Sequence, residues 1–117
     1  EKQAPKINFR VEERDADWLF CVEDNGIGIK EEYFEKILEM LRKENIQVLL
    51  IQAPITKSLY QSYTNNTFFD AKMNTYGVYY NFNRMIHLKD SLHFYDGHHL
   101  NQKGVELFNQ DIIRLIQ

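Results

Sequence analysis

One amphipathic segment constrains the fold of this chain more than any other. Residues 30–45 read KEEYFEKILEMLRKEN, and their apolar side chains recur at positions i, i+3, i+4 and i+7. That spacing puts them on one face of a helix and leaves charged side chains on the others. Acidic residues open the segment and basic residues close it, as the helix dipole favours. We therefore predict a helix over 30–45 that packs on a sheet through Phe34, Ile37, Leu38 and Leu41.

The residues before this helix have the period of β-strands. Two segments alternate from one side chain to the next, and they are marked by Ile7, Phe9 and Val11 and by Trp18, Phe20 and Val22. A polar link over 13–17 separates them. Two alternating segments joined by a short polar link predict an antiparallel hairpin.

The rest of the chain mixes strand-like and helix-like segments. Residues 48–54 form a continuous apolar run typical of a buried parallel strand, and residues 78–82 are rich in β-formers. Between them we predict a polar link over 56–66 and a helix over about 67–76 that stops at Gly77. Residues 83–99 predict a loop with a turn of helix, and Asn101 caps a final helix. The buried face of that helix holds Val105, Phe108, Ile112, Leu115 and Ile116.

These elements predict a single α/β domain with the order ββαβαβα over residues 1–117. We expect a four-stranded mixed sheet with helices on both faces and with the first strand antiparallel at one edge. A chain of 117 residues with 44% hydrophobic content is long enough for one core and too short for two independent ones.

Composition excludes several classes of partner. The net charge is -3 and there is no basic run, so we expect no nucleic acid partner. The longest apolar run is too short for a membrane span and no leader is visible, so we expect a soluble, cytoplasmic protein. The single cysteine, Cys21, has no partner for an intramolecular disulfide. The hairpin edge, or an uncovered apolar patch, offers a surface for a homodimer.

The first candidate site is the segment Asp24-Asn25-Gly26-Ile27-Gly28-Ile29. Glycines spaced by one residue after a strand allow a tight bend and the close approach of a flat ligand, and a carboxylate there can accept a hydrogen bond from an exocyclic amine. The alternative is an ordinary strand-to-helix turn in which the glycines take positive φ.

Residues ~4–37, which include VEDNGIGI, resemble the G1-box region of GHKL-type ATPase domains in sensor histidine kinases. The resemblance implies that Asp24 reads the adenine amino group and that Gly26 and Gly28 shape the adenine pocket. The family's upstream Mg²⁺-binding asparagine helix and its glycine-rich lid have no counterpart here. We therefore expect weak adenine-nucleotide binding at most, and no cofactor.

The second candidate site is the segment Tyr95-Asp96-Gly97-His98-His99-Leu100-Asn101. An aspartate three residues before a histidine can bring its carboxylate to the imidazole and fix the tautomer, so that the other ring nitrogen acts as a general base. The sequence thus predicts a contact between Asp96 and His99. The alternative is that His99 is merely packed or hydrogen-bonded at the start of a helix.

Residues ~38–117 resemble the C-terminal part of an SGNH (GDSL-type) hydrolase, and YDGHHLNQKG matches that family's D-x-x-H-L-N block. The resemblance implies that Asp96 is the triad acid and His99 the base. The family's G-D-S nucleophile block and its oxyanion blocks are absent. The serines of this chain, Ser58, Ser62 and Ser91, do not lie in a strand-to-helix elbow.

The histidines predict no dedicated metal site. All of them fall in one short region together with two aspartates, without the ligand spacing of a zinc site. A solvated loop explains this clustering, and the alternative is adventitious binding of Zn²⁺ or Ni²⁺. The residues concerned are His87, His93, His98, His99, Asp90 and Asp96.

The two resemblances meet inside the amphipathic helix, whereas natural fusions join at exposed linkers. We interpret the chain as a recombined or engineered chimera whose fragments, 1–37 and 38–117, share one core. The resulting expectation is a scaffold with no complete active site and no dedicated catalytic function. The alternatives are weak SGNH-like ester hydrolysis through Asp96 and His99, and weak nucleotide binding through Asp24.

Overall fold

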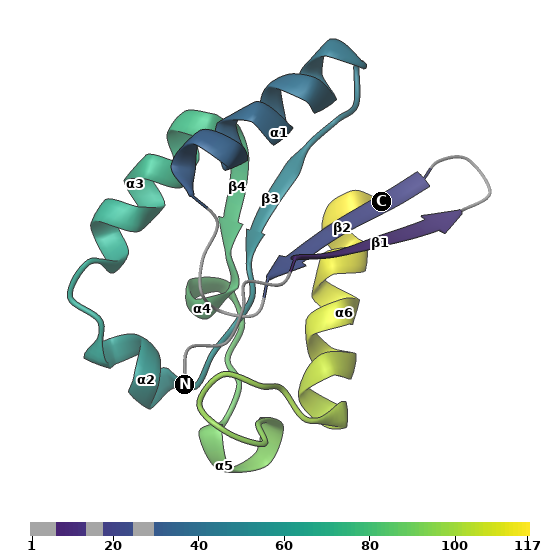
Figure 1. The fold of residues 1–117 in the computed structure, drawn as a ribbon. Coiled ribbons are helices and arrows are strands. Elements are labelled where there is room, and N and C mark those ends of the chain that lie inside the picture. The colour runs from purple at the N-terminus through teal and green to yellow at the C-terminus, as the bar shows by residue number, and fades with distance from the viewer. Residues whose placement is uncertain (1–6, 14–17, 25–29) are drawn as a thin grey trace. The chain divides into compact units, whose positions relative to one another are not determined.

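The fold is given by a computed structural model of the 117-residue chain. It describes the backbone of residues 7–13 and 18–24 and all of residues 30–117. The chain divides into two compact units, Glu1–Ile46 and Gln47–Gln117. Figure 1 labels the helices and strands of both units.

The first unit begins with the predicted hairpin. Strands β1 (Ile7–Glu13) and β2 (Trp18–Asp24) pair antiparallel, in a register that sets Val11 opposite Phe20. The predicted antiparallel pairing is therefore confirmed. Alternating side chains on both segments explain why each adopts an extended backbone.

Helix α1 (Glu31–Lys43) is the helix predicted from the amphipathic segment. Its carboxyl end is closed by Asn45, whose φ of 55° lies in the left-handed region. The amide of Asn45 donates to the carbonyl of Arg42 (3.0 Å) and that of Ile46 to the carbonyl of Leu41 (2.9 Å). These two bonds form a Schellman motif. Leu38 of the predicted apolar face is buried, with 3% of its surface exposed.

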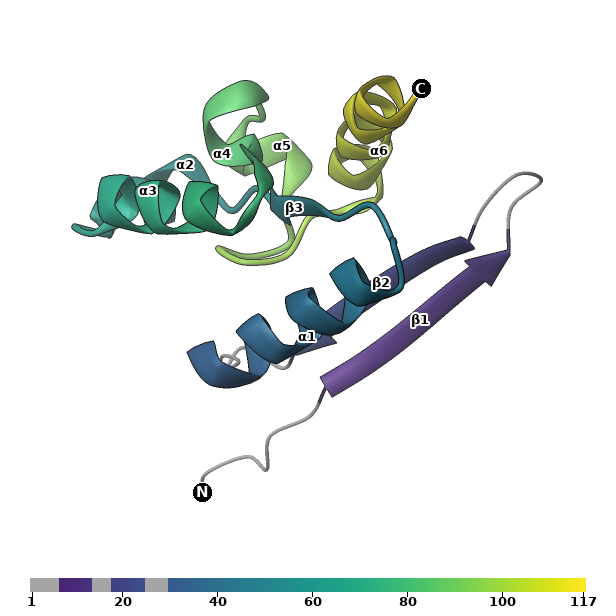
Figure 2. The same cartoon turned by 90° about the horizontal axis from the view of Figure 1, so that it is seen from above.

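The second unit is organised around two parallel strands. β3 (Leu49–Gln52) and β4 (Val78–Asn81) pair with Leu50 opposite Tyr79, and both of these side chains are buried. They are connected by α2 (Lys57–Ser62) and α3 (Asn66–Tyr76). Helix α3 ends at Gly77, whose φ of 155° favours glycine. Figures 1 and 2 show α3 and α6 on opposite sides of β3.

Three helices follow β4. They are α4 (Phe82–Met85), α5 (Asp90–His93) and α6 (Gln102–Ile116). Phe82 is 1% exposed and packs edge-to-face on Phe108, with ring centroids 4.9 Å apart. The Asn101 side chain accepts a hydrogen bond from the amide of Gly104 (2.9 Å), which confirms the predicted cap. Ile116, predicted to be buried, is 43% exposed.

The predicted four-stranded mixed sheet is wrong. The described strands form two separate two-stranded sheets, β1 with β2 and β3 with β4. A four-stranded sheet would place β3 and the hairpin in one sheet, but the described partner of β3 is β4. A hydrophobic pattern shows that a segment is a strand and not which strand it pairs with, because backbone donors and acceptors are the same in every strand. The predicted element order ββαβαβα also omits three short helices that the structure contains, α2, α4 and α5.

Candidate functional site

Asp96 and His99 are in direct contact. The Nδ1 atom of His99 lies 2.8 Å from Oδ1 and 2.9 Å from Oδ2 of Asp96. Because an ionised carboxylate only accepts hydrogen bonds, the ring donates through Nδ1 and its Nε2 keeps the lone pair. The contact predicted from the sequence is therefore present. The catalytic role of the pair stays a prediction.

The Asp96 carboxylate is held in its ionised form. The backbone amide of His98 donates to Oδ1 (2.8 Å) and lowers the pKa of Asp96, and the side chain and amide of His99 lower it further. Both members of the pair are open to solvent, with 73% of the His99 side chain and 58% of the Asp96 side chain exposed. No side chain in the described part of the molecule is hydrogen-bonded to Nε2 of His99. The lone pair on Nε2 therefore faces solvent.

The loop that carries the pair is tied to the segment after β3. The amide and hydroxyl of Thr56 donate to the carbonyl of Gly97, at 3.0 and 3.3 Å. Thr56 is 7% exposed, and the amide of Tyr95 donates to the carbonyl of His99 (2.8 Å) across the base of the loop. The loop thus has a buried anchor close to the carboxyl end of a parallel strand, the edge at which α/β proteins gather their functional groups.

Asp90 fixes the start of α2. Its carboxylate accepts from the amide of Lys57 (2.7 Å) and from the amide and hydroxyl of Ser58 (3.0 and 2.9 Å). Burial raises the pKa of Asp90, but the hydrogen bonds from Ser58 and Lys57 outweigh it and hold the pKa below its usual value. The Ser58 hydroxyl is thereby engaged, and the Ser62 hydroxyl donates to the carbonyl of Leu59 (2.6 Å). In residues 30–117, no serine is hydrogen-bonded to His99.

His93 is a structural histidine. It is 8% exposed, and its Nδ1 accepts a hydrogen bond from the amide of Lys89 (2.8 Å), so its ring proton lies on Nε2. Its carbonyl accepts from the amide of Asn101 (2.9 Å). His93 therefore joins α5 to the start of α6. The segment Tyr95–Asn101 begins two residues after it.

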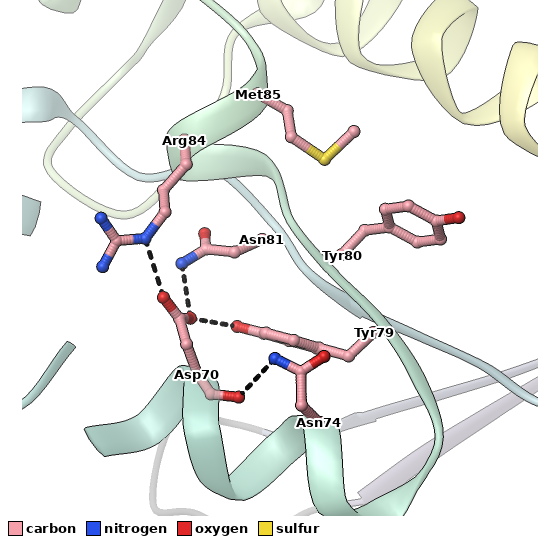
Figure 3. Close-up of a pocket in the computed structure, with 7 residues that line it drawn as sticks. All are labelled: Asp70, Asn74, Tyr79, Tyr80, Asn81, Arg84 and Met85. Atoms are coloured by element: carbon pink, nitrogen blue, oxygen red, sulfur yellow. Dashed lines mark hydrogen bonds and ion pairs between the residues drawn. The ribbon is translucent and has the colours of Figure 1, made fainter. Parts of the chain in front are cut away.

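A second polar cluster, absent from the sequence-based predictions, surrounds Asp70. Figure 3 shows Asp70 reaching from α3 toward side chains of β4 and α4. Its carboxylate accepts from the Tyr79 hydroxyl (2.8 Å), the side-chain amide of Asn81 (2.8 Å) and the Nε of Arg84 (2.7 Å). The Asn81 amide also donates to the Tyr60 hydroxyl (2.9 Å). These bonds cross-link α2, α3, β4 and α4.

The charges of this cluster follow from its hydrogen bonds. Burial raises the pKa of Asp70, but the bonds from Tyr79, Arg84 and Asn81 outweigh it and lower the pKa below its usual value. Burial, and then the bond to Asp70, raise the pKa of Tyr79 well above its usual value. The Tyr79 hydroxyl also lies 3.0 Å from Oε1 of Gln52. Its single proton serves the stronger acceptor, the ionised carboxylate of Asp70.

A pocket of about 220 Å³ opens beside this cluster (Figure 3). It is lined by Asp70, Asn74, Tyr79, Tyr80, Asn81, Arg84 and Met85. The sequence marks neither Asp70 nor Arg84 as a candidate site residue. The two residues are 14 positions apart and belong to no motif, so no local signal marks them. Their contact arises only when α3 and α4 pack against β4.

The predicted adenine site begins at the end of β2. Asp24 ends β2, but Gly26 and Gly28 lie outside the described residues. Over the described residues, no three His, Cys, Asp or Glu side chains come together as ligands of a metal ion. Nor does that part of the chain contain a helix both long and apolar enough to cross a membrane. The adenine site stays a prediction.

Comparison with known proteins adds no assignment. No known protein family, curated protein or solved structure matches this chain. The likeness of 1–37 to a GHKL-type ATPase and that of 38–117 to an SGNH hydrolase therefore both stay predictions. What is known of the molecule is its fold, a solvent-facing Asp96–His99 pair and a polar cluster beside a pocket.

Proposed function

We propose that the chain is an α/β scaffold without a complete active site, on which the Asp96–His99 pair acts as a weak general base for ester hydrolysis with water as the nucleophile. The single observation that carries the proposal is the contact from Nδ1 of His99 to the Asp96 carboxylate (2.8 Å), which leaves Nε2 free toward solvent. A neutral imidazole oriented in this way can take a proton from water.

The reaction needs few groups. Nε2 of His99 removes a proton from a water molecule as the water oxygen attacks the ester carbonyl, and Asp96 stabilises the imidazolium that forms. Collapse of the tetrahedral intermediate expels the alkoxide, which takes the proton back from Nε2. General-base catalysis contributes about 10²–10⁴-fold in enzymes, and the exposure of both side chains favours the low end of that range.

The test is hydrolysis of p-nitrophenyl acetate by the full chain. We expect His99→Ala to lower the rate of hydrolysis to that of buffer. Asp96→Asn should give an intermediate rate, because it removes the negative charge that stabilises the imidazolium. His98→Ala is the matched control, since its backbone amide bonds to Asp96 but its side chain is not bonded to the carboxylate. A solvent deuterium isotope effect separates attack by water from direct attack by the imidazole.

Two results would reject the proposal. The first is hydrolysis that survives in His99→Ala, because the imidazole would then be dispensable. The second is a wild-type rate equal to that of an unrelated protein with the same number of histidines. A rate without an isotope effect would assign His99 as a nucleophile instead of a general base.

A further inference from the structure

Strand β4 has an open edge that borders the pocket. Among the described strands its only neighbour is β3, so the backbone groups on its other edge have no strand partner there. The pocket is lined by Tyr79, Tyr80 and Asn81, which are consecutive residues of β4. Successive side chains of a strand point to opposite faces of the sheet. Consecutive residues can therefore line one pocket only where that pocket extends around the edge of the strand. The pocket therefore runs along the open edge of β4.

The positively charged side chain of Arg84 lies at the carboxyl end of this edge. Arg84 lies in α4, which begins directly after β4. Its Nε donates to Asp70 (2.7 Å) and its guanidinium carbon lies 5.7 Å from the centroid of the Tyr60 ring, so the group is held on two sides. Figure 3 shows its two terminal nitrogens pointing away from the Asp70 carboxylate. Within residues 30–117 no acceptor is bonded to them. A guanidinium with both terminal nitrogens free can bind a carboxylate through two hydrogen bonds.

We propose that the open edge of β4 binds the C-terminal end of an extended peptide, with its terminal carboxylate on Arg84. Backbone hydrogen bonds to a strand edge supply affinity, and capture of the carboxylate sets the register. A peptide whose carboxyl end lies beside the carboxyl end of β4 runs parallel to it and extends the parallel β3–β4 pair. Met85, 47% exposed, and Tyr80 supply apolar surface for the peptide's side chains. This site does not depend on Asp96 or His99.

The probe is N-acetyl-Val-Val with a free carboxylate, titrated into the ¹⁵N-labelled full chain. The pocket of about 220 Å³ is smaller than the ~300–1,000 Å³ that hold drug-sized ligands, which suits a dipeptide with millimolar affinity. We expect amide shifts centred on residues 79–81 and on Arg84. The C-terminal amide of the same peptide should bind about tenfold more weakly, because it lacks the charge that Arg84 recognises. Equal binding of acid and amide, shifts elsewhere, or no shifts at about 20 mM peptide would overturn the proposal.

Variants separate the pocket from the rest of the molecule. Arg84→Lys keeps the positive charge beside Asp70 but removes the two terminal nitrogens that would bind a carboxylate together. It should weaken binding of the peptide acid about tenfold. Arg114→Lys is the matched control, because Arg114 also pairs with an aspartate, Asp111 at 2.9 Å, but lies on α6. Met85→Ala should weaken binding while leaving the Asp70 hydrogen bonds intact, so it tests the site even if Arg84→Lys destabilises the fold.

Two outcomes with these variants would contradict the site. Wild-type affinity in both Arg84→Lys and Met85→Ala would show that the peptide binds elsewhere. Loss of affinity in His99→Ala would place the peptide at the Asp96–His99 pair and not at β4. Unchanged affinity in His99→Ala, together with losses in the two pocket variants, is the result expected.

Discussion

Gly104, in the first turn of α6, packs directly against the backbone carbonyl of His93. A Cβ atom at position 104 would overlap that oxygen and would also stand 2.9 Å from Cδ2 of Leu100. The carbonyl cannot easily retreat, because it accepts the amide of Asn101 (2.9 Å) and belongs to a buried residue. Glycine is therefore required here for close packing of α5 on α6.

Gly104→Ala should destabilise the second unit by about 1–3 kcal/mol, the usual cost of overpacking. The direction of the change in stability is informative, because a glycine-to-alanine change at an exposed helix position stabilises a protein by about 1 kcal/mol. Urea unfolding followed by far-UV circular dichroism measures it, with the exposed Lys103→Ala as the control in the same turn. An increase in stability would show that α5 and α6 do not pack this closely.

Asp70→Asn should lower the free energy of unfolding by about 1–3 kcal/mol. The substitution removes the charged acceptor of the hydrogen bonds from Tyr79, Asn81 and Arg84. Only 19% of the Asp70 side chain is exposed, so water cannot easily replace that acceptor. Asp111→Asn is the matched control, because in the described part of the chain its carboxylate pairs with a largely exposed arginine, Arg114. This change should alter the free energy of unfolding by no more than about 0.5 kcal/mol. The two urea midpoints give the comparison. Equal effects would mean that the Asp70 cluster is not cooperative.

Stability should fall in acid. Burial raises the pKa values of Asp70 and Asp90, but their hydrogen bonds outweigh it and hold both pKa values below the usual value of an aspartate. A carboxyl group with a lower pKa in the folded state stabilises the fold above its unfolded pKa, and this contribution is lost as the pH falls through the folded pKa. Urea midpoints measured from neutral pH downward should therefore drop below about pH 4. The drop should be shallower in Asp70→Asn, and an identical profile in that variant would exclude Asp70 as a source.

The His99 ring should carry its proton on Nδ1. Long-range ¹H–¹⁵N spectra of the neutral ring distinguish the two tautomers. We expect the Nδ1–H form in the wild type, because the Asp96 carboxylate accepts from that atom, and loss of this preference in Asp96→Ala. The neighbouring His98 serves as an internal control. An Nε2–H form in the wild type would contradict the base assigned to His99.

The predicted adenine site calls for a direct titration. The alternative function, weak adenine binding through Asp24, requires that ATP at millimolar concentration change the fluorescence of Trp18, the chain's single tryptophan, and that Asp24→Ala abolish the change. The reason is that an alanine side chain has no oxygen to accept a hydrogen bond from the adenine amino group. A response that does not depend on Asp24 would remove adenine recognition from this segment.

A contact in a candidate site could be predicted from the sequence only where its residues lie close together in the chain. The Asp96–His99 contact joins residues three apart, and a short loop brings them together whatever surrounds it. The Asp70–Arg84 ion pair joins residues on two different helices, separated by a strand. Nothing in the spacing of Asp70 and Arg84 predicts that pair, and the pocket beside it was missed for the same reason.

The sequence by itself determined the elements that short-range periodicity specifies: the β1–β2 hairpin, α1, α3, β4 and the Asn101-capped α6. Their side-chain periods and caps operate within a few residues, so they can be read locally. Only the tertiary structure decided that β3 pairs with β4. It also decided that a helix starts at Lys57, where the carboxylate of Asp90 accepts amides 32 and 33 residues away in the chain. Strand edges and helix ends accept any partner of the right chemistry, so the choice is made by the packing of the whole unit.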